Sequence, residues 1–169
     1  NDTMYDNTNV KLPNGQGMKC SATPTQHVIL PMPGNNDKYY VIMSTDPNNW
    51  GPPSDVSYSI VDMTLNGGKG DVVVAQKTIA VVSPGPQLLS EGLTAVKNAN
   101  GYDWWVLSHG VMPGQNGMRY YKFLITAAGV QPVTTQDIGT NCSNMTSYLV
   151  ASPNGNKICR VARQGQRHL

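Results

Sequence analysis

Charged residues are scarce in this chain, at 13% of its 169 positions, and the formal net charge is only +2. The twelve lysines and arginines are scattered along the chain, which argues against nucleic acid as a partner. No apolar run approaches the ~20 residues that a membrane-spanning helix needs, so membrane insertion is not expected. These shortages exclude nucleic-acid binding and membrane insertion as first hypotheses.

Cysteine is also rare, with only Cys20, Cys142 and Cys159. None of the three lies in the CxxC spacing of zinc or redox motifs, so neither chemistry is expected. Cys142 and Cys159 flank a predicted strand, and the sequence leaves open a disulfide between them or two free thiols. An odd count leaves at least one cysteine unpaired within the chain.

Helical patterns are nearly absent, whereas turn-forming residues are plentiful, with 17 glycines and 12 prolines. The apolar runs are short and rich in β-branched and aromatic residues, and Asn, Gly and Pro bound them. This pattern predicts an all-β fold, and the length favours a single domain.

A strand-rich unit recurs along the chain. Each copy has a first strand, a turn containing Asn and Gly, a second strand, a polar loop and a third strand, and copies begin roughly 55 to 65 residues apart. The predicted strands of the first two copies are 27–30, 39–43 and 58–63, then 93–96, 104–107 and 120–125. A third copy, with strands 148–151 and 157–161, reaches only its second strand.

A repeat of this kind predicts antiparallel four-stranded meanders of β-propeller type. One blade cannot bury both of its faces, so neighbouring blades must stack on it. We expect an incomplete propeller of about two and a half to three blades, because a ring usually needs four to eight. The predicted units are 1–24 (the last strand of a preceding blade and a linker), 25–90 (a blade), 91–140 (a blade) and 141–169 (a truncated blade).

The two loops between second and third strands are the candidate binding surface, since both should emerge on the same side of the blades. Loops on a rigid scaffold often carry function. Trp50 can stack on a sugar ring or anchor a protein, or it can fold back over the blade edge. The candidate ligand-binding residues are Asp46, Asn49, Trp50, His109 and Asn116.

The glycine-rich segment 66–71 matches neither a phosphate-binding loop nor a calcium-binding loop. A phosphate loop needs Gly-Lys-Ser/Thr before a helix, whereas valines follow here. A calcium loop needs alternating oxygen ligands and a closing Glu. The segment therefore predicts a tight hairpin between the third and fourth strands of a blade, and no cofactor or metal is expected.

No motif of a hydrolase or nucleotide-binding enzyme occurs, and His109 and His27 have no catalytic partner nearby in sequence. The alternative is a glycan-processing propeller enzyme of sialidase or glycosidase type, whose acids are dispersed along the chain. Its candidate carboxylates are Asp46, Asp55, Asp62 and Asp103. The sequence favours a non-catalytic module.

Three stretches resemble a known group of proteins. They are Tyr-Asp-Asn at 5–7 with Leu-Pro-Asn-Gly at 12–15, the segment 58–72 containing Val-Asp-Met-Thr-Leu-Asn-Gly-Gly, and 93–97 with 102–110. Their order is similar to the WD40-like propeller region of large secreted surface proteins that gliding bacteria export by the type IX pathway. The stretch 151–157 fits the same pattern, so the resemblance runs from about Tyr5 to Lys157.

The resemblance implies an extracellular or cell-surface location and an adhesion-related role. The candidate loop face predicts a protein or glycan partner, and the exposed strand edges predict either further blades of a parent chain or a second copy of this chain. Residues 2–4 also resemble the acceptor pattern for O-linked glycans on such exported proteins, with Thr3 as the modified residue.

Overall fold

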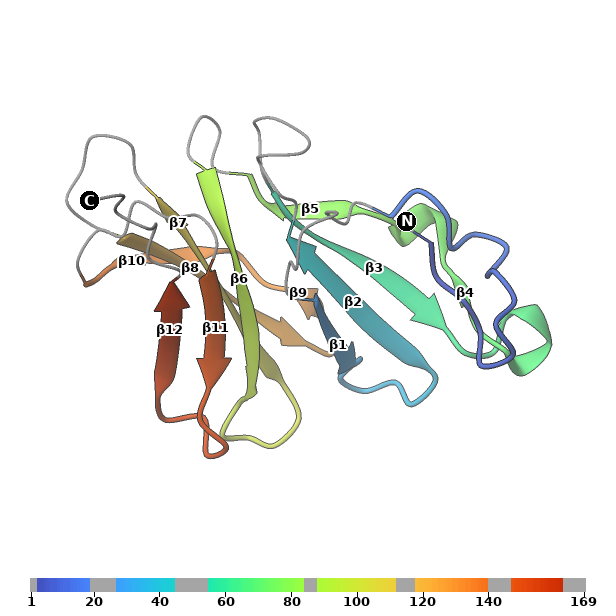
Figure 1. The fold of residues 1–169 in the computed structure, drawn as a ribbon. Helices are drawn as coiled ribbons and strands as arrows, with labels where there is room; N and C mark the ends of the chain where they lie inside the picture. The colour runs from blue at the N-terminus through green and yellow to red at the C-terminus, as the bar shows by residue number, and fades with distance from the viewer. Residues whose placement is uncertain are drawn as a thin grey trace, which may run out of the picture.

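The computed structural model describes residues 3–18, 27–44, 55–83, 88–111, 118–139 and 147–162. The regular structure in these ranges consists of strands and two short 3-10 turns, η1 (Asn66–Gly68) and η2 (Val74–Gln76). The expected all-β fold is therefore confirmed. Figure 1 shows two sheets side by side and a separate two-stranded hairpin next to the second sheet.

The first sheet is an antiparallel meander of β1 (His27–Pro31), β2 (Lys38–Ser44) and β3 (Val56–Asp62). Two short strands, β4 (Asp71–Val72) and β5 (Ile79–Val82), pair with the same edge of β3. β4 pairs with the end of β3 and β5 with its beginning. The fourth strand of the predicted meander is therefore divided in two.

The second sheet repeats this plan in β6 (Leu88–Lys97), β7 (Trp104–Val111) and β8 (Met118–Thr126). Its outer strand is divided in the same way, because β9 (Gly129–Val130) pairs with the end of β8 and β10 (Thr134–Asp137) with its beginning. The hairpin of β11 (Ser147–Ala151) and β12 (Ile158–Ala162) repeats only the first two strands.

The turn between the first and second strands uses the same hydrogen bonds in all three copies, although the turn of the first copy is one residue longer and its glycine precedes the asparagine. The backbone N–H of the first turn residue donates to the carbonyl that closes the turn, at 2.9, 2.8 and 2.9 Å, and an Asn Oδ1 accepts the backbone N–H two residues further on. A glycine with φ of 74, 77 or 70° completes each turn. These residues are Met32, Gly34 and Asn35; Asn98, Asn100 and Gly101; Ser152, Asn154 and Gly155. The shared turn explains the recurrence of Asn and Gly in the sequence.

The shared turn and strand register define two equivalent faces in every copy. We call the face that carries Ile29 in β1, Ala95 in β6 and Leu149 in β11 the front face. The opposite face, with Leu30, Val96 and Val150, is the back face. This assignment follows because successive strand residues point to opposite sides of a sheet.

The main core lies where the back face of the first sheet meets the front face of the second. Twelve buried residues from both sheets form one cluster: Leu30, Tyr40, Ile42, Val56, Ile60, Val82, Leu89, Leu93, Val106, Tyr121, Phe123 and Ile125. Trp104 packs against this cluster and its indole Nε1 donates to the carbonyl of Pro31 at 3.1 Å. The back face of the second sheet is covered in turn by the hairpin, whose Leu149 lies against Gly92 and His109.

Replacing Phe123 by Ala should lower the free energy of unfolding by about 3–5 kcal/mol, because the change leaves a cavity in the core between the sheets. Urea denaturation measures the loss. Tyr102→Ala is the matched control, since Tyr102 is 77% exposed in a turn, and its effect should stay within about 0.5 kcal/mol. Equal effects of the two changes would contradict the assignment of this core.

Candidate functional site

The N-terminal segment, residues 3–18, folds into a compact loop whose structure depends on Asp6. Asp6 Oδ1 accepts the backbone N–H of Thr8 at 2.8 Å, the hydroxyl of Thr8 at 2.7 Å and the backbone N–H of Val10 at 2.9 Å. These hydrogen bonds, with the hydroxyl of Thr8 first, lower the pKa of Asp6 to about 2, and the ammonium of Lys69 adds to the effect. A bridge between Tyr5 and Lys11 closes the loop.

The N-terminal segment is attached to the outer strand β4 of the first sheet by an amide clamp. Asn14 donates its backbone N–H to Asp71 Oδ1 at 3.0 Å and its side-chain amide to Asp71 Oδ2 at 2.7 Å. Gly15 follows, where a Cβ would lie 2.9 Å from Leu12 Cβ and 3.0 Å from the carbonyl of Met4. Only glycine therefore fits at this position of the Leu-Pro-Asn-Gly stretch.

A small second core forms under this segment. Met18 is buried with Val41, Met43 and Val72, and Ser59 approaches the sulfur of Met18 at 4.0 Å. Lys77 adds a hydrogen bond to the carbonyl of Gln16. The segment therefore covers the front face over β2, β3 and β4 and leaves β1 less covered, where Ile29 is exposed.

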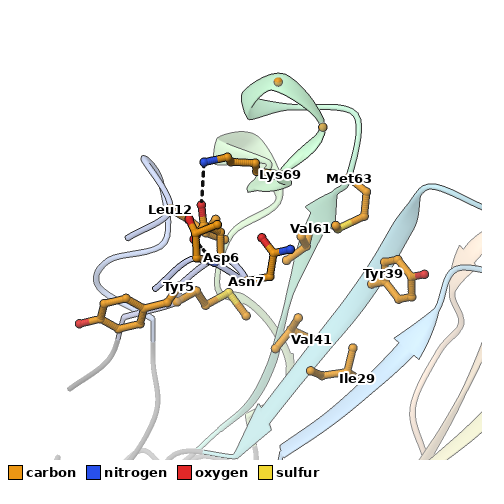
Figure 2. Close-up of a pocket in the computed structure, with 14 residues that line it drawn as sticks. Tyr5, Asp6, Asn7, Leu12, Ile29, Tyr39, Val41, Val61, Met63 and Lys69 are labelled. Atoms are coloured by element: carbon orange, nitrogen blue, oxygen red, sulfur yellow. Dashed lines mark hydrogen bonds and ion pairs between the residues drawn. The ribbon is translucent and has the colours of Figure 1, made fainter. Parts of the chain in front are cut away.

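A groove of about 750 Å³ remains between the N-terminal segment and the strands β1, β2 and β3 (Figure 2). One wall is the front face of the first sheet, and the other is the N-terminal loop with the η1 turn. The residues that Figure 2 labels on the two walls are Ile29, Tyr39, Val41, Val61 and Met63, then Tyr5, Asp6, Asn7, Leu12 and Lys69. Ile29 is 64% exposed, although it lies in the middle of a strand.

The chemistry of the groove is apolar with one ion pair. Lys69 Nζ lies 3.6 Å from Asp6 Oδ2 at the end formed by the η1 turn. In the described part of the chain, no three His, Cys, Asp or Glu side chains gather as a metal site would require. The groove is therefore suited to binding an apolar surface, because its lining offers a large apolar area and few polar groups.

A second polar arrangement lies in the seam between the second sheet and the hairpin. His109 on β7 is fully buried, and its Nε2 accepts hydrogen bonds from Ser147 Oγ at 3.0 Å and Arg160 Nε at 2.6 Å. Because Nε2 is the acceptor, the ring proton is assigned to Nδ1. Burial, together with the charge of Arg160, lowers the pKa of His109 to about 4. The neutral imidazole thus joins the hairpin to the sheet.

The structure places His109 inside this seam and not on the loop face. A ligand would reach its imidazole only if the hairpin moved away from the sheet. The other candidate ligand-binding residues, Asp46, Asn49, Trp50 and Asn116, lie outside the described residues, so their role stays a prediction. Thr3 lies in the described N-terminal segment and is half-buried.

The cysteines and the candidate acids are placed as follows. Cys159 is a free, exposed thiol, and Cys142 lies outside the described residues, so their pairing is untested. Asp62 accepts hydrogen bonds from Thr64 and Asp103 accepts one from Asn100, each within its own turn. Asp55 is buried, and Asp46 lies outside the described ranges.

Sequence reasoning missed the groove, because it depends on contacts between distant segments such as Asn14 and Asp71. One signal was available in β1, where Val28, Ile29 and Leu30 make both faces of an inner strand apolar. A strand with two apolar faces needs cover on both sides. In the described structure, the Ile29 side chain remains more than half exposed.

A comparison with protein-family models, with curated proteins and with solved structures finds no match to this chain. In the part of the chain that the structure describes, no helix is long and apolar enough to cross a membrane.

Acidification should destabilise the protein through His109. Its pKa is lowered from 6.5 to about 4, so between these values the unfolded chain binds more protons than the folded chain. Stability should therefore fall as the pH drops from 6.5 to 4, by up to about 3 kcal/mol. Urea denaturation across this range measures the slope, and His109→Gln should flatten it. An unchanged slope in the variant would contradict the assignment.

Loss of the amide clamp should release the N-terminal segment. Asp71→Ala removes both acceptors of Asn14, so amide hydrogen exchange in residues 3–18 should speed up while exchange in β7 and β8 stays slow. Asp103→Ala, which breaks a hydrogen bond in a turn of the second sheet, is the control. Unchanged exchange in residues 3–18 of Asp71→Ala would refute the clamp.

Proposed function

We propose that this chain is part of a β-propeller and serves as a non-catalytic binding or structural module of a bacterial cell-surface protein. The observation that carries the proposal is the face-to-face packing of the three copies. The back face of the first sheet packs on the front face of the second, and the back face of the second packs on the front face of the hairpin. Blades of a propeller pack in this manner around an axis. On this proposal the chain contains two blades and the first two strands of a third.

The inner strands support the same proposal. The first strands of the three copies, β1, β6 and β11, together line one hollow of about 620 Å³. In a propeller the first strand of each blade lies nearest the central channel. The hollow between these strands is the place where such a channel would run.

The location rests on the resemblance to type IX-exported surface proteins, and the partner rests on the loop face with Trp50. An extracellular, adhesion-related role follows from the resemblance, with a protein or glycan as the partner at the loop face. The loops that carry Trp50 and Asn116 follow the equivalent strands β2 and β7 and precede β3 and β8, which supports a common side for both. Thr3 is the proposed O-glycosylation site.

A binding module is favoured over a glycan-processing enzyme by the placement of the acids. Asp62 and Asp103 each hold a turn through short hydrogen bonds, at 2.6 and 2.7 Å, in different parts of the fold. A glycosidase needs two carboxylates facing each other across a cleft, at roughly 5 to 9.5 Å. Both Asp62 and Asp103 stabilise turns of the fold.

Attachment of the purified chain to a glycan array and to bacterial surface extracts tests the proposal. Trp50→Ala should weaken binding about tenfold or more, since aromatic anchors carry much of the energy of such contacts. Tyr102→Ala is the matched control, because this exposed tyrosine lies in the turn between β6 and β7, at the other end of the blade. Circular dichroism checks the fold of both variants. Equal binding by Trp50→Ala and the unaltered chain would refute the loop face as the binding surface.

A further inference from the structure

The two ends of the sheet stack carry complementary surfaces. At one end, the back face of the β11–β12 hairpin exposes Tyr148, Val150, Cys159 and Val161. At the other end, the front face of the first sheet lines the apolar groove beside the N-terminal segment. We propose that these two surfaces bind each other between two copies of this chain, head to tail, an inference that rests on the propeller-type packing proposed above.

The contact continues an interface that the molecule already contains. Within one chain, a back face packs on a front face at both seams, first between the two sheets and then between the second sheet and the hairpin. The stack leaves one back face and one front face without such a neighbour in the described structure. Val150 and Val161, at 53% and 56% exposed, are the counterparts on the hairpin of Leu30 and Ile42, which are buried in the first seam.

The open part of the front face lies at the first strand of the sheet. Met18 packs on Val41 and Met43 of β2, so both of these residues are buried, whereas Ile29 of β1 is 64% exposed. From Ile29 the groove continues over Tyr39 to Met63. In the proposed contact, Ile29 of one copy lies opposite Val150 of the other.

This arrangement would complete a blade from two chains. The hairpin would supply the inner half of the blade. The N-terminal segment of the next copy, which packs on β2 and β4 of its own sheet, would stand beside the hairpin in place of the outer strands of the blade. Because the two surfaces differ, the contact is heterologous, and it builds rings or filaments instead of a closed pair.

Paired variants and light scattering test the proposal in reducing buffer, which prevents cross-linking through cysteine. Ile29→Lys places a charge in the groove and Val150→Lys places one on the hairpin face. Both positions are more than half exposed, so each lysine fits the folded chain. Val74→Lys is the control, because Val74 is exposed in η2, away from both surfaces.

The mass of the unaltered chain and of Val74→Lys should rise with concentration, whereas Ile29→Lys and Val150→Lys should each stay at 18.2 kDa. An equal mixture of these two variants should form a dimer of twice this mass, because one intact groove and one intact hairpin face remain. Circular dichroism confirms folding, and Ile29→Gln with Val150→Gln replaces the pair if a lysine variant unfolds.

Three results would overturn the proposal: an unaltered chain that stays monomeric, an Ile29→Lys variant that still associates, or folded variants whose mixture stays monomeric. A monomeric unaltered chain that still binds its partner through Trp50 would leave the proposed function standing and remove only the second copy as the occupant of the groove.

Discussion

The packing of one apolar sheet face on the next is the interaction on which the rest of this structure depends. Each sheet is a single layer that carries apolar side chains on both faces, so one copy cannot bury them all by itself. Phe123 and Ile42 are fully buried only because the two sheets meet. The same need places the hairpin on the second sheet, where Leu149 and the Ser147–His109 hydrogen bond fix it. Binding at a loop or at an end surface therefore requires the two sheets and the hairpin to stay packed in this arrangement.

The front face of the first sheet shows how a sheet at the end of a stack is covered. Ser57 and Ser59 occupy the positions that Tyr121 and Phe123 hold in the second sheet, as the strand registers show. The small side chains leave room for Met18, so the N-terminal segment lies directly on β2, β3 and β4. The groove beside it is the remainder of a face that a full blade would cover.

Much of the fold could be predicted from local sequence signals. The three Asn- and Gly-containing turns lie where the sequence places them, because turn chemistry is local. The connection predicted as a tight hairpin at 66–71 is longer, since β3 ends at Asp62 and β4 begins at Asp71 with η1 between them, but Gly67, Gly68 and Gly70 have positive φ as expected. The divided outer strand was missed, since nothing in the polar residues 134–137 signals a separate strand. The burial of His109 and the groove could not be predicted either, because both depend on segments that are distant in sequence: Ser147 lies 38 residues from His109, and Asp71 lies 57 residues from Asn14.

The most direct test of the stacking is an NMR measurement of nuclear Overhauser contacts across the two seams. The account predicts contacts between the Leu149 methyl groups and the His109 ring, and between the Trp104 indole N–H and residues around Pro31, where the hydrogen bond is 3.1 Å. Contacts within each sheet together with none across either seam would mean that the copies fold as separate sheets, and would contradict the account.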